Sequence, residues 1–177
     1  SVWVVLDEAY FEYVHNPSYP DGVALHLKYR NLIVTRTFSK AYGLAALRVG
    51  YSISSYEFAD LLNRVRHPFN VNSMAMVAAV SALGDEEFVG NSIEVNEKGM
   101  RQLCLGLENL DLKFIPSIGN FVSFDTGSPG LEVFERMLAN GVIVRPIAEY
   151  GLPSFLRVTV GLEDENSRFL DVLGAIL

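Results

Sequence analysis

Apolar runs near the start of the chain predict the strands of a sheet. Residues 2–6 and 32–35 are continuous apolar or β-branched runs, and residues 48–53 form a third, more mixed run after a segment of small residues. A continuous apolar run is typical of a strand that is buried on both faces, as in a parallel sheet. Because short links separate the three runs, we expect an α/β sheet in this part of the chain.

Helical spacing replaces this pattern from residue 55 onward. Apolar residues recur at helical spacing over 56–62 and Pro68 closes that segment, while a helix of small residues is expected over 72–83, ended by Gly84. Acidic residues at 85–87 then begin a helical pattern that continues to about residue 110. A helix of roughly 24 residues would be about 36 Å long, which is enough to link two domains.

Shorter elements follow residue 111 and indicate an α+β arrangement. The pattern predicts strands over 112–115, 120–124, 142–145 and 156–160, and helices over 131–139 and 164–177. We therefore expect the chain to have three parts. These are a first domain over 1–84, an interdomain helix over 85–110 and a small α+β domain over 111–177.

Composition and charge exclude several classes of protein. Half of the 177 residues are apolar, so the chain can fold around a sizeable core, and its net charge of −7 argues against a general nucleic-acid surface. The single cysteine, Cys104, can form no intramolecular bridge, and no long uninterrupted apolar run indicates a membrane span. The histidines are too widely spaced for a metal site. We therefore expect a cytoplasmic protein that binds neither nucleic acid, nor a membrane, nor a metal.

Side chains with nucleophilic or anion-binding groups gather where the second predicted strand ends. Lys40 is flanked by the hydroxyls of Thr37 and Ser39, an environment that can leave part of a lysine as the free nucleophilic amine. Arg48 adds a guanidinium that suits a dianionic phosphate. Ligands of α/β sheets gather at the carboxyl ends of the strands, so these side chains predict a phosphate site beside an amine.

An acid and a phenol follow the first predicted strand. The carboxylate of Asp7 can keep a pyridine nitrogen protonated, and a protonated ring accepts carbanion electrons far better than a neutral one. Tyr10 lies three residues further on and can donate a hydrogen bond to a ring hydroxyl. Each residue taken alone has a simpler explanation, such as a cap or a surface ion pair. Together with Lys40 and its neighbours, they are the set that a pyridoxal 5'-phosphate site requires.

The amino-acid sequence of these segments resembles that of a known family. Asp-Glu-Ala-Tyr at 7–10 and Thr-Phe-Ser-Lys-Ala-Tyr-Gly-Leu-Ala at 37–45 are similar to fold-type I pyridoxal-phosphate aminotransferases, and to the histidinol-phosphate aminotransferase family in particular. The similarity continues through residues 68–72, 119–121, 141–146 and 156–161, so it covers nearly the whole chain. It implies part of a large domain with a mostly parallel sheet, followed by a smaller α+β domain.

The resemblance also implies roles for individual residues. Lys40 would form the Schiff base with the cofactor, Asp7 would pair with the pyridine nitrogen, and Tyr10 would bond the ring oxygen. The phosphate would be held by Thr37, Ser39 and Arg48. The substrate carboxylate would be bound by Arg157, with Arg145 as a second anion contact, although a strand-edge ion pair is the simpler reading of Arg157.

Members of this family are about twice as long as this chain, and the strand-like opening without a signal peptide suggests a start in mid-domain. The resemblance therefore implies the C-terminal half of an aminotransferase that is a homodimer when full length. The expected reaction exchanges an amino group between L-histidinol phosphate and 2-oxoglutarate, in histidine biosynthesis. An aromatic-amino-acid aminotransferase that acts on phenylalanine, and a non-catalytic fragment that binds no cofactor, are the alternatives.

Overall fold

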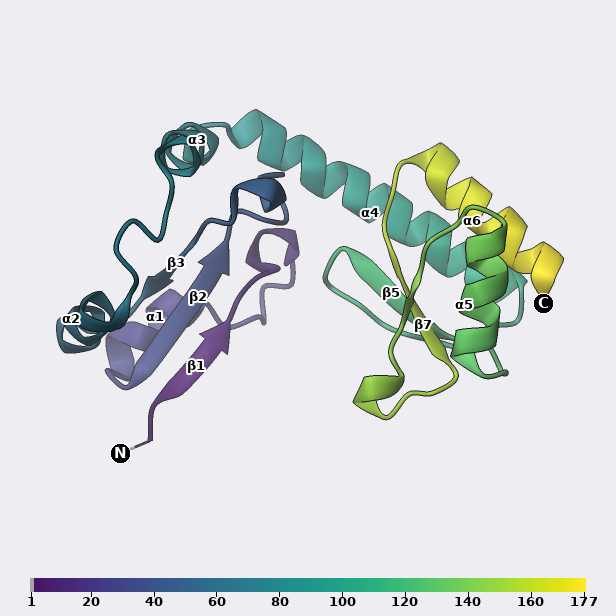
Figure 1. Cartoon of the computed structure of the whole chain (residues 1–177), viewed down its shortest axis with the longest axis horizontal. Coiled ribbons are helices and arrows are strands. Elements are labelled where there is room, and N and C mark those ends of the chain that lie inside the picture. The colour runs from purple at the N-terminus through teal and green to yellow at the C-terminus, as the bar shows by residue number, and fades with distance from the viewer. Residues whose placement is uncertain (1) are drawn as a thin grey trace. The chain divides into compact units, whose positions relative to one another are not determined.

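A three-stranded sheet organises the first part of the chain in the computed structural model, which describes residues 2–177. Its strands are β1 (Val4–Asp7), β2 (Leu32–Thr37) and β3 (Gly50–Ile53), in the order β1-β2-β3 (Figure 1). β1 and β2 are parallel, as predicted, whereas β3 runs antiparallel to β2. The chain divides into two compact units, Ser1–Ser92 and Ile93–Leu177, and each is described by itself below.

Strand β1 differs from the expectation in its burial. The prediction that it is buried on both faces is wrong for this chain, because Val4 is 48% and Val5 62% exposed. β1 lies at an edge of the sheet, so only one of its sides has a neighbouring strand. Central strand β2 does fit the prediction, since Leu32, Ile33 and Val34 are all buried.

Strand β3 begins two residues later than predicted. Arg48 has a φ of +53°, in the left-handed region, and this conformation cannot belong to a strand. The chain therefore enters β3 only at Gly50, which pairs with Thr37 of β2. A Cβ at Gly50 would lie 2.8 Å from the backbone oxygen of Arg36, so this pairing requires glycine.

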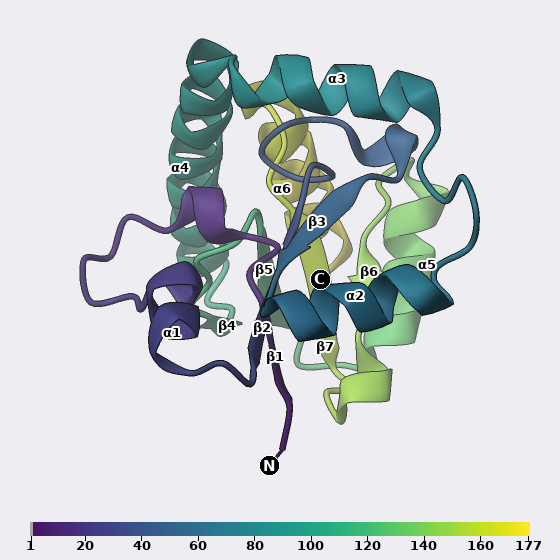
Figure 2. The ribbon, with the colours of Figure 1, turned by 90° about the vertical axis from the view of Figure 1, so that its left-hand side faces the viewer.

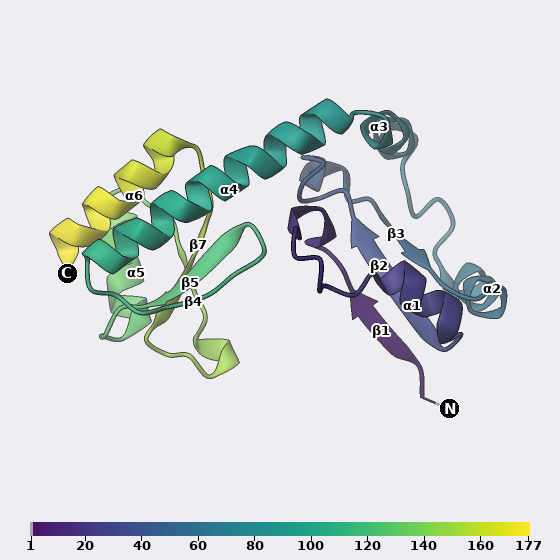
Figure 3. The same cartoon turned by 180° about the vertical axis from the view of Figure 1, so that it is seen from behind.

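The helices of the first unit surround this sheet. They are the 3-10 turns η1 (Phe11–Tyr13) and η2 (Ala45–Leu47), and the helices α1 (Gly22–Lys28), α2 (Tyr56–Val65) and α3 (Ser73–Leu83). Figure 2 shows α1 and α2 on opposite sides of the strands. In Figure 3, where α1 lies in front of β2, both β1 and β2 point toward the end of the sheet at which α3 lies.

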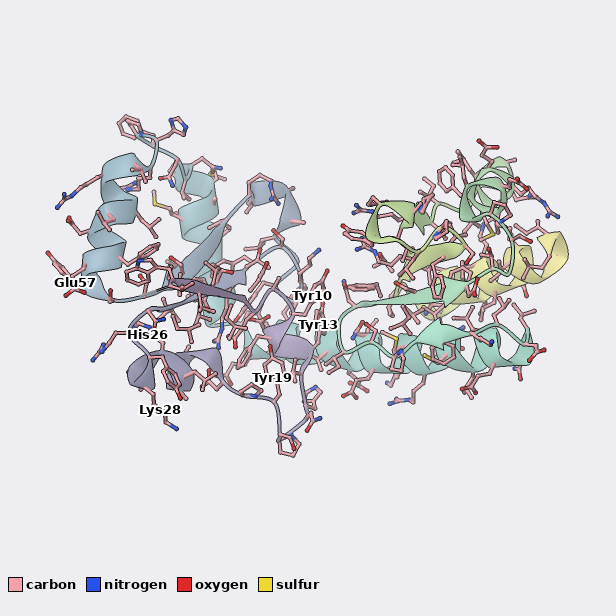
Figure 4. All side chains as sticks on the ribbon, turned by 90° about the horizontal axis from the view of Figure 1, so that it is seen from below. Tyr10, Tyr13, Tyr19, His26, Lys28 and Glu57 are labelled. Atoms are coloured by element: carbon pink, nitrogen blue, oxygen red, sulfur yellow. The ribbon has the colours of Figure 1, made fainter. Side chains whose placement is uncertain are left out.

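Helix α1 was not predicted, because it is short and its apolar residues show no long repeat. The Asp21 carboxylate accepts the N–H of Val23 at 2.9 Å and so begins the helix. His26 is buried toward the sheet, with Nδ1 2.7 Å from the backbone oxygen of Leu32, while Lys28 is exposed (Figure 4). The histidine thus fastens α1 to the first residue of β2.

The second unit contains the elements predicted after residue 111, but the bounds of two strands are wrong: the strand predicted over 142–145 is found at Arg145–Pro146, and that predicted over 112–115 only at Phe114–Ile115. Helix α4 (Glu86–Asn109) continues across the boundary between the units, and α5 (Gly130–Ala139) and α6 (Glu163–Ile176) match their predictions closely. The sheet has the order β4-β5-β7-β6 and is antiparallel throughout. Its strands are β4 (Phe114–Ile115), β5 (Phe121–Asp125), β6 (Arg145–Pro146) and β7 (Phe155–Thr159), with the 3-10 turn η3 (Ala148–Tyr150) after β6.

The register of β5 and β7 separates the two faces of this sheet. Val122 pairs with Val158 and Phe124 with Leu156, and all four are buried on one face. Helices α4, α5 and α6 pack onto these residues and complete the core with Leu103, Leu107, Val133, Met137, Phe169 and Leu173. Successive side chains of a strand point to opposite faces, so Arg157, between Leu156 and Val158, is directed away from this core.

No helix within residues 2–177 combines the length and the apolar character needed to cross a membrane. The predicted domain limits at residues 84 and 110 stay a prediction.

The core of the second unit can be tested by two matched substitutions in α4. Leu107 is fully buried and Leu105 is 60% exposed on the same helix. We expect Leu107→Ala to lower the free energy of unfolding by about 2–5 kcal/mol, because it leaves a cavity in the core. Leu105→Ala should change it by no more than about 0.5 kcal/mol. Urea denaturation checks both, and equal losses in the two variants would contradict this assignment of the core.

Candidate active site

A cavity of about 440 Å³ lies at the carboxyl ends of β1 and β2. We call it the strand-end cavity. Its lining includes Asp7, Thr37, Ser39, Lys40 and Arg48, which the sequence analysis had singled out. The lining also includes Ala9, Thr35, Arg36 and Ala45, which it had not. Its volume lies within the range of small-molecule sites, which is roughly 300–1,000 Å³. The structure brings the carboxylate of Asp7, the hydroxyls of Thr37 and Ser39, and the cations of Lys40 and Arg48 to this one cavity.

The carboxylate of Asp7 is held at the edge of the sheet by two donors. Parallel pairing sets Asp7 beside Thr35. Oδ1 of Asp7 accepts the backbone N–H of Ala9 at 3.1 Å and lies 3.4 Å from the hydroxyl of Thr35. Thr35 was missed by the sequence analysis, although two-residue alternation places it on the same face of β2 as Thr37. The carboxylate thus has a defined orientation before any ligand binds.

Hydroxyl groups and a guanidinium meet on the other side of the strand-end cavity. The backbone N–H of Ser39 donates to Oγ1 of Thr37 at 3.1 Å. Nη1 of Arg48 donates to Oγ of Ser39 at 3.2 Å and to the backbone oxygen of Ala45 at 2.7 Å. The left-handed backbone at Arg48 turns the chain here, between η2 and β3. A guanidinium beside hydroxyls is the donor set that phosphate and carboxylate groups prefer.

The amine of Lys40 lies beside the ring of Tyr10. Nζ of Lys40 is 5.3 Å from the centre of that ring, within the range of a cation–π contact. No carboxylate of the described residues forms an ion pair with Lys40, whose side chain is half-buried. Tyr10 stands next to η1, where Figure 4 labels it together with Tyr13. The tyrosine is therefore a neighbour of the lysine rather than part of the cavity lining given above.

A buried ion pair behind these residues was missed by the sequence analysis. The Glu8 carboxylate has no exposed area. Its Oε2 accepts a hydrogen bond from Nε of Arg36 at 2.9 Å, and Nη2 of Arg36 forms an ion-pair contact with the same oxygen at 2.8 Å. Burial acts to lower the pKa of Arg36, but hydrogen bonds with Glu8 and Tyr51 outweigh it and raise that pKa above its ordinary value. An acid that directly follows a strand-end Asp was the available signal, because alternation sends the two side chains to opposite faces.

Two arginines meet on the sheet of the second unit. Arg157 of β7 pairs across the strands with Arg145 of β6 on one side and with Ser123 of β5 on the other. Like charges directly opposite each other on a sheet repel, so an anion between them would be favourable. The guanidinium of Arg157 lies over the ring of Phe121, 4.8 Å from its centre. This row faces away from the helical core of the unit.

Of these two arginines, Arg145 is the one that forms an ion pair. Its Nη2 lies 2.9 Å from Oε1 of Glu149. The pKa of Glu149 is lowered by a hydrogen bond from the backbone of Glu149 and by one from the side chain of Arg145. No carboxylate within residues 2–177 forms an ion pair with Arg157, so the simpler reading of that residue as a strand-edge ion pair describes Arg145 instead.

Groups of three His, Cys, Asp or Glu side chains that could hold a metal ion do not occur among residues 2–177.

Comparisons with known proteins give a consistent result. Residues 1–173 match the family model described as aminotransferase class I and II. Histidinol-phosphate aminotransferase 2 of Pseudomonas fluorescens (strain Pf0-1) is 57% identical over 176 residues, which are 99% of this chain and 48% of that protein. Histidinol-phosphate aminotransferase 1 of Nitrosococcus oceani is 53% identical over the same shares of the two chains. This chain therefore spans about half the length of the curated relatives that it matches.

A solved structure extends the likeness to three dimensions. Histidinol-phosphate aminotransferase from Sinorhizobium meliloti, in complex with pyridoxal-5'-phosphate, superposes with a TM-score of 0.87 at 27% identity. The match covers 99% of this chain and 50% of the other. The two units therefore have the fold-type I aminotransferase architecture expected from the sequence. With a family model that matches nearly its whole length, the chain belongs to the class I and II aminotransferases.

Proposed function

We propose that the full-length protein containing this chain is a pyridoxal-phosphate-dependent aminotransferase that exchanges an amino group between L-histidinol phosphate and 2-oxoglutarate. The observation that carries the proposal is that Asp7, Ser39, Lys40 and Arg48 line one cavity. The names of the curated relatives, at 53–57% identity, support the substrate. We place the chain in the C-terminal half of that protein. From the resemblance we also propose a cytoplasmic homodimer, which analytical ultracentrifugation and cell fractionation of the full-length protein would test.

The residues of the strand-end cavity fit this cofactor by their chemistry. A dianionic phosphate requires donors, which Thr37, Ser39 and Arg48 supply, and a pyridinium nitrogen requires a carboxylate, which Asp7 supplies. The structure of the Sinorhizobium meliloti relative in complex with pyridoxal-5'-phosphate supports the same assignment. When bound, the cofactor supplies an aldehyde that takes up amino groups and a ring that withdraws electrons.

Lys40 and Tyr10 have the reactive and orienting roles in this proposal. The amine of Lys40 would hold the cofactor at its aldehyde carbon, and as a free amine it would take the proton from the substrate carbon that bears the amino group. The Tyr10 phenol donates to the ring hydroxyl. The carboxylate of Asp7, oriented by Ala9 and Thr35, keeps the ring nitrogen protonated.

The two arginines of the second unit are proposed to hold the substrates. A guanidinium accepts a carboxylate or a phosphate ester in the same bidentate manner, and so one arginine can serve both half-reactions. Arg157 is suited to this because no carboxylate among residues 2–177 lies within ion-pair distance of it, and Arg145 is suited to a second anion contact beside it.

Removal of the amine tests the covalent step. We expect Lys40→Ala in the full-length protein to abolish the cofactor adduct that borohydride reduction fixes, and to lower kcat by at least roughly 100-fold. Lys28→Ala, which removes an exposed lysine of α1, serves as the control and should retain one reducible adduct per chain. Intact-mass spectrometry measures the adduct. A full adduct on Lys40→Ala would contradict the role of this lysine.

The phosphate contact can be separated from the ring contacts with two ligands. Arg48→Ala should raise the dissociation constant for pyridoxal phosphate by about 10- to 100-fold, because it removes a charge-assisted hydrogen bond. It should leave the dissociation constant for pyridoxal, which has no phosphate, nearly unchanged. Fluorescence titration with both ligands checks this, and an equal loss for both would speak against Arg48 as a phosphate ligand.

The substrate role of Arg157 predicts a different signature. Arg157→Ala should raise KM for histidinol phosphate and for 2-oxoglutarate by about 10- to 100-fold while cofactor affinity stays at the wild-type value. Arg136→Ala, at an exposed arginine of α5, is the control and should leave both KM values unchanged. Steady-state kinetics decide the matter. Transamination of phenylalanine without turnover of histidinol phosphate would overturn the proposed substrate.

A further inference from the structure

The acid next to Asp7 is buried more completely than any group that lines the strand-end cavity. Glu8 is 1% exposed, and each of its carboxylate oxygens has a partner. Oε1 accepts the backbone N–H of Gly22 at 2.9 Å, and Oε2 accepts from Arg36. A Cβ at Gly22 would lie 2.6 Å from Oε1, so the start of α1 is fitted closely around this carboxylate. These contacts of Glu8 hold the backbone in place immediately after Asp7.

Arg36 of β2 connects Glu8, at the end of β1, to the second strand. It lies between Thr35, the partner of Asp7, and Thr37, which accepts the N–H of Ser39. Its guanidinium stacks on the ring of Phe11, 3.7 Å from the centre, and also reaches Asp21 at 3.3 Å. With one hydrogen bond and one ion-pair contact to Glu8 and a ring against its plane, the guanidinium has little freedom to rotate. The ion pair therefore fastens the end of β1 to the end of β2 from the face opposite Asp7.

Glu8 is the buried carboxylate that pairs with Arg36, and the half-exposed carboxylate of Asp21 is its second ion-pair partner. Glu12 also lies near Arg36, and burial raises the pKa of Glu12 above its ordinary value although the charge of Arg36 acts to lower it. A buried ion pair contributes little net stability, because desolvation of both charges offsets their attraction. Its dependable effect is geometric, since the hydrogen bond from Nε and the ion-pair contact of Nη2 with the same oxygen define how the planar guanidinium meets the carboxylate.

We propose that the Glu8–Arg36 ion pair is a positioning device that sets where Asp7 and the segment from Thr37 to Lys40 stand toward the bound cofactor. This inference rests on the proposed function, because it requires pyridoxal phosphate in the strand-end cavity. Glu8 is not among the residues that line the strand-end cavity, and Arg36, which is among them, has its guanidinium engaged by Glu8. Both act through the carboxyl ends of β1 and β2, which they hold in register.

The test separates positioning from stability in the full-length protein. Arg36→Met leaves the buried carboxylate of Glu8 without its ion pair, and Glu8→Gln leaves Arg36 with only the half-exposed carboxylate of Asp21, so both should unfold at lower urea concentration. The double variant Glu8→Gln/Arg36→Met buries no charge and should recover most of the wild-type midpoint. Arg64→Met is the control, because it breaks an exposed ion pair with Asp60 in the same unit. Each protein is titrated with pyridoxal phosphate, and the absorbance of the bound cofactor is followed against pH.

We expect the double variant to bind pyridoxal phosphate at least about tenfold more weakly than wild type despite its recovered stability, as loss of supporting contacts does around other bound groups. Its absorbance should also titrate at a different pH, because Asp7 no longer holds its place at the ring nitrogen. Arg64→Met should match wild type in both measurements. Wild-type affinity and an unchanged titration in the double variant would overturn the inference.

Arg36→Lys provides an independent decision if the double variant does not fold. It keeps the charge but offers no planar pair of donors, so we expect affinity between those of wild type and Arg36→Met. A folded Arg36→Lys protein with wild-type affinity and titration would likewise overturn the inference. Failure of the wild-type protein itself to take up pyridoxal phosphate would instead overturn the proposed function.

Discussion

Parallel pairing of β1 with β2 is the constraint on which the candidate site depends. Parallel strands end at the same edge of a sheet, so residues far apart in the sequence arrive there together. The register Asp7 with Thr35 then determines which side chains meet. The bend that follows Thr37 and the left-handed turn at Arg48 bring the remaining polar groups to the same edge. Backbone geometry, more than any single side-chain contact, assembles this site.

In each sheet, one face packs against the rest of the unit and the other carries polar side chains that can meet a ligand. In the second unit, Leu156 and Val158 enter the core while Arg157 between them points to the other face. In the first unit, Thr35 and Thr37 share one face of β2, while Arg36 points to the other and reaches buried Glu8. The same two-residue alternation therefore supplies an apolar or buried side that holds the strand and a polar side that can meet a ligand.

Most of the fold could be predicted from the sequence because its longer elements carry strong periodic patterns. Helix α4 and the strands β2, β5 and β7 lie close to the predicted ranges. The edge exposure of β1 could not be predicted, since an apolar run does not reveal how many strands will flank it. Helix α1 was missed because a helix of this length depends on its cap at Asp21 and on His26 rather than on periodicity. The residues lining the strand-end cavity were found only in part, because Thr35 and Arg36 have no distinctive type and owe their place to register.

Adjacent carboxylates with opposite surroundings make the first strand unusually sensitive to its length. Removing or adding one residue within Val4–Leu6 would shift the register by one residue, so every later side chain of the strand would point to the opposite face of the sheet. Glu8 would then point to the face that carries the strand-end cavity, and Asp7 to the face that carries Arg36, so the contacts of Glu8 with Gly22 and Arg36 would be lost. An insertion or a deletion within this strand should therefore disturb the site more than a substitution at one of its residues.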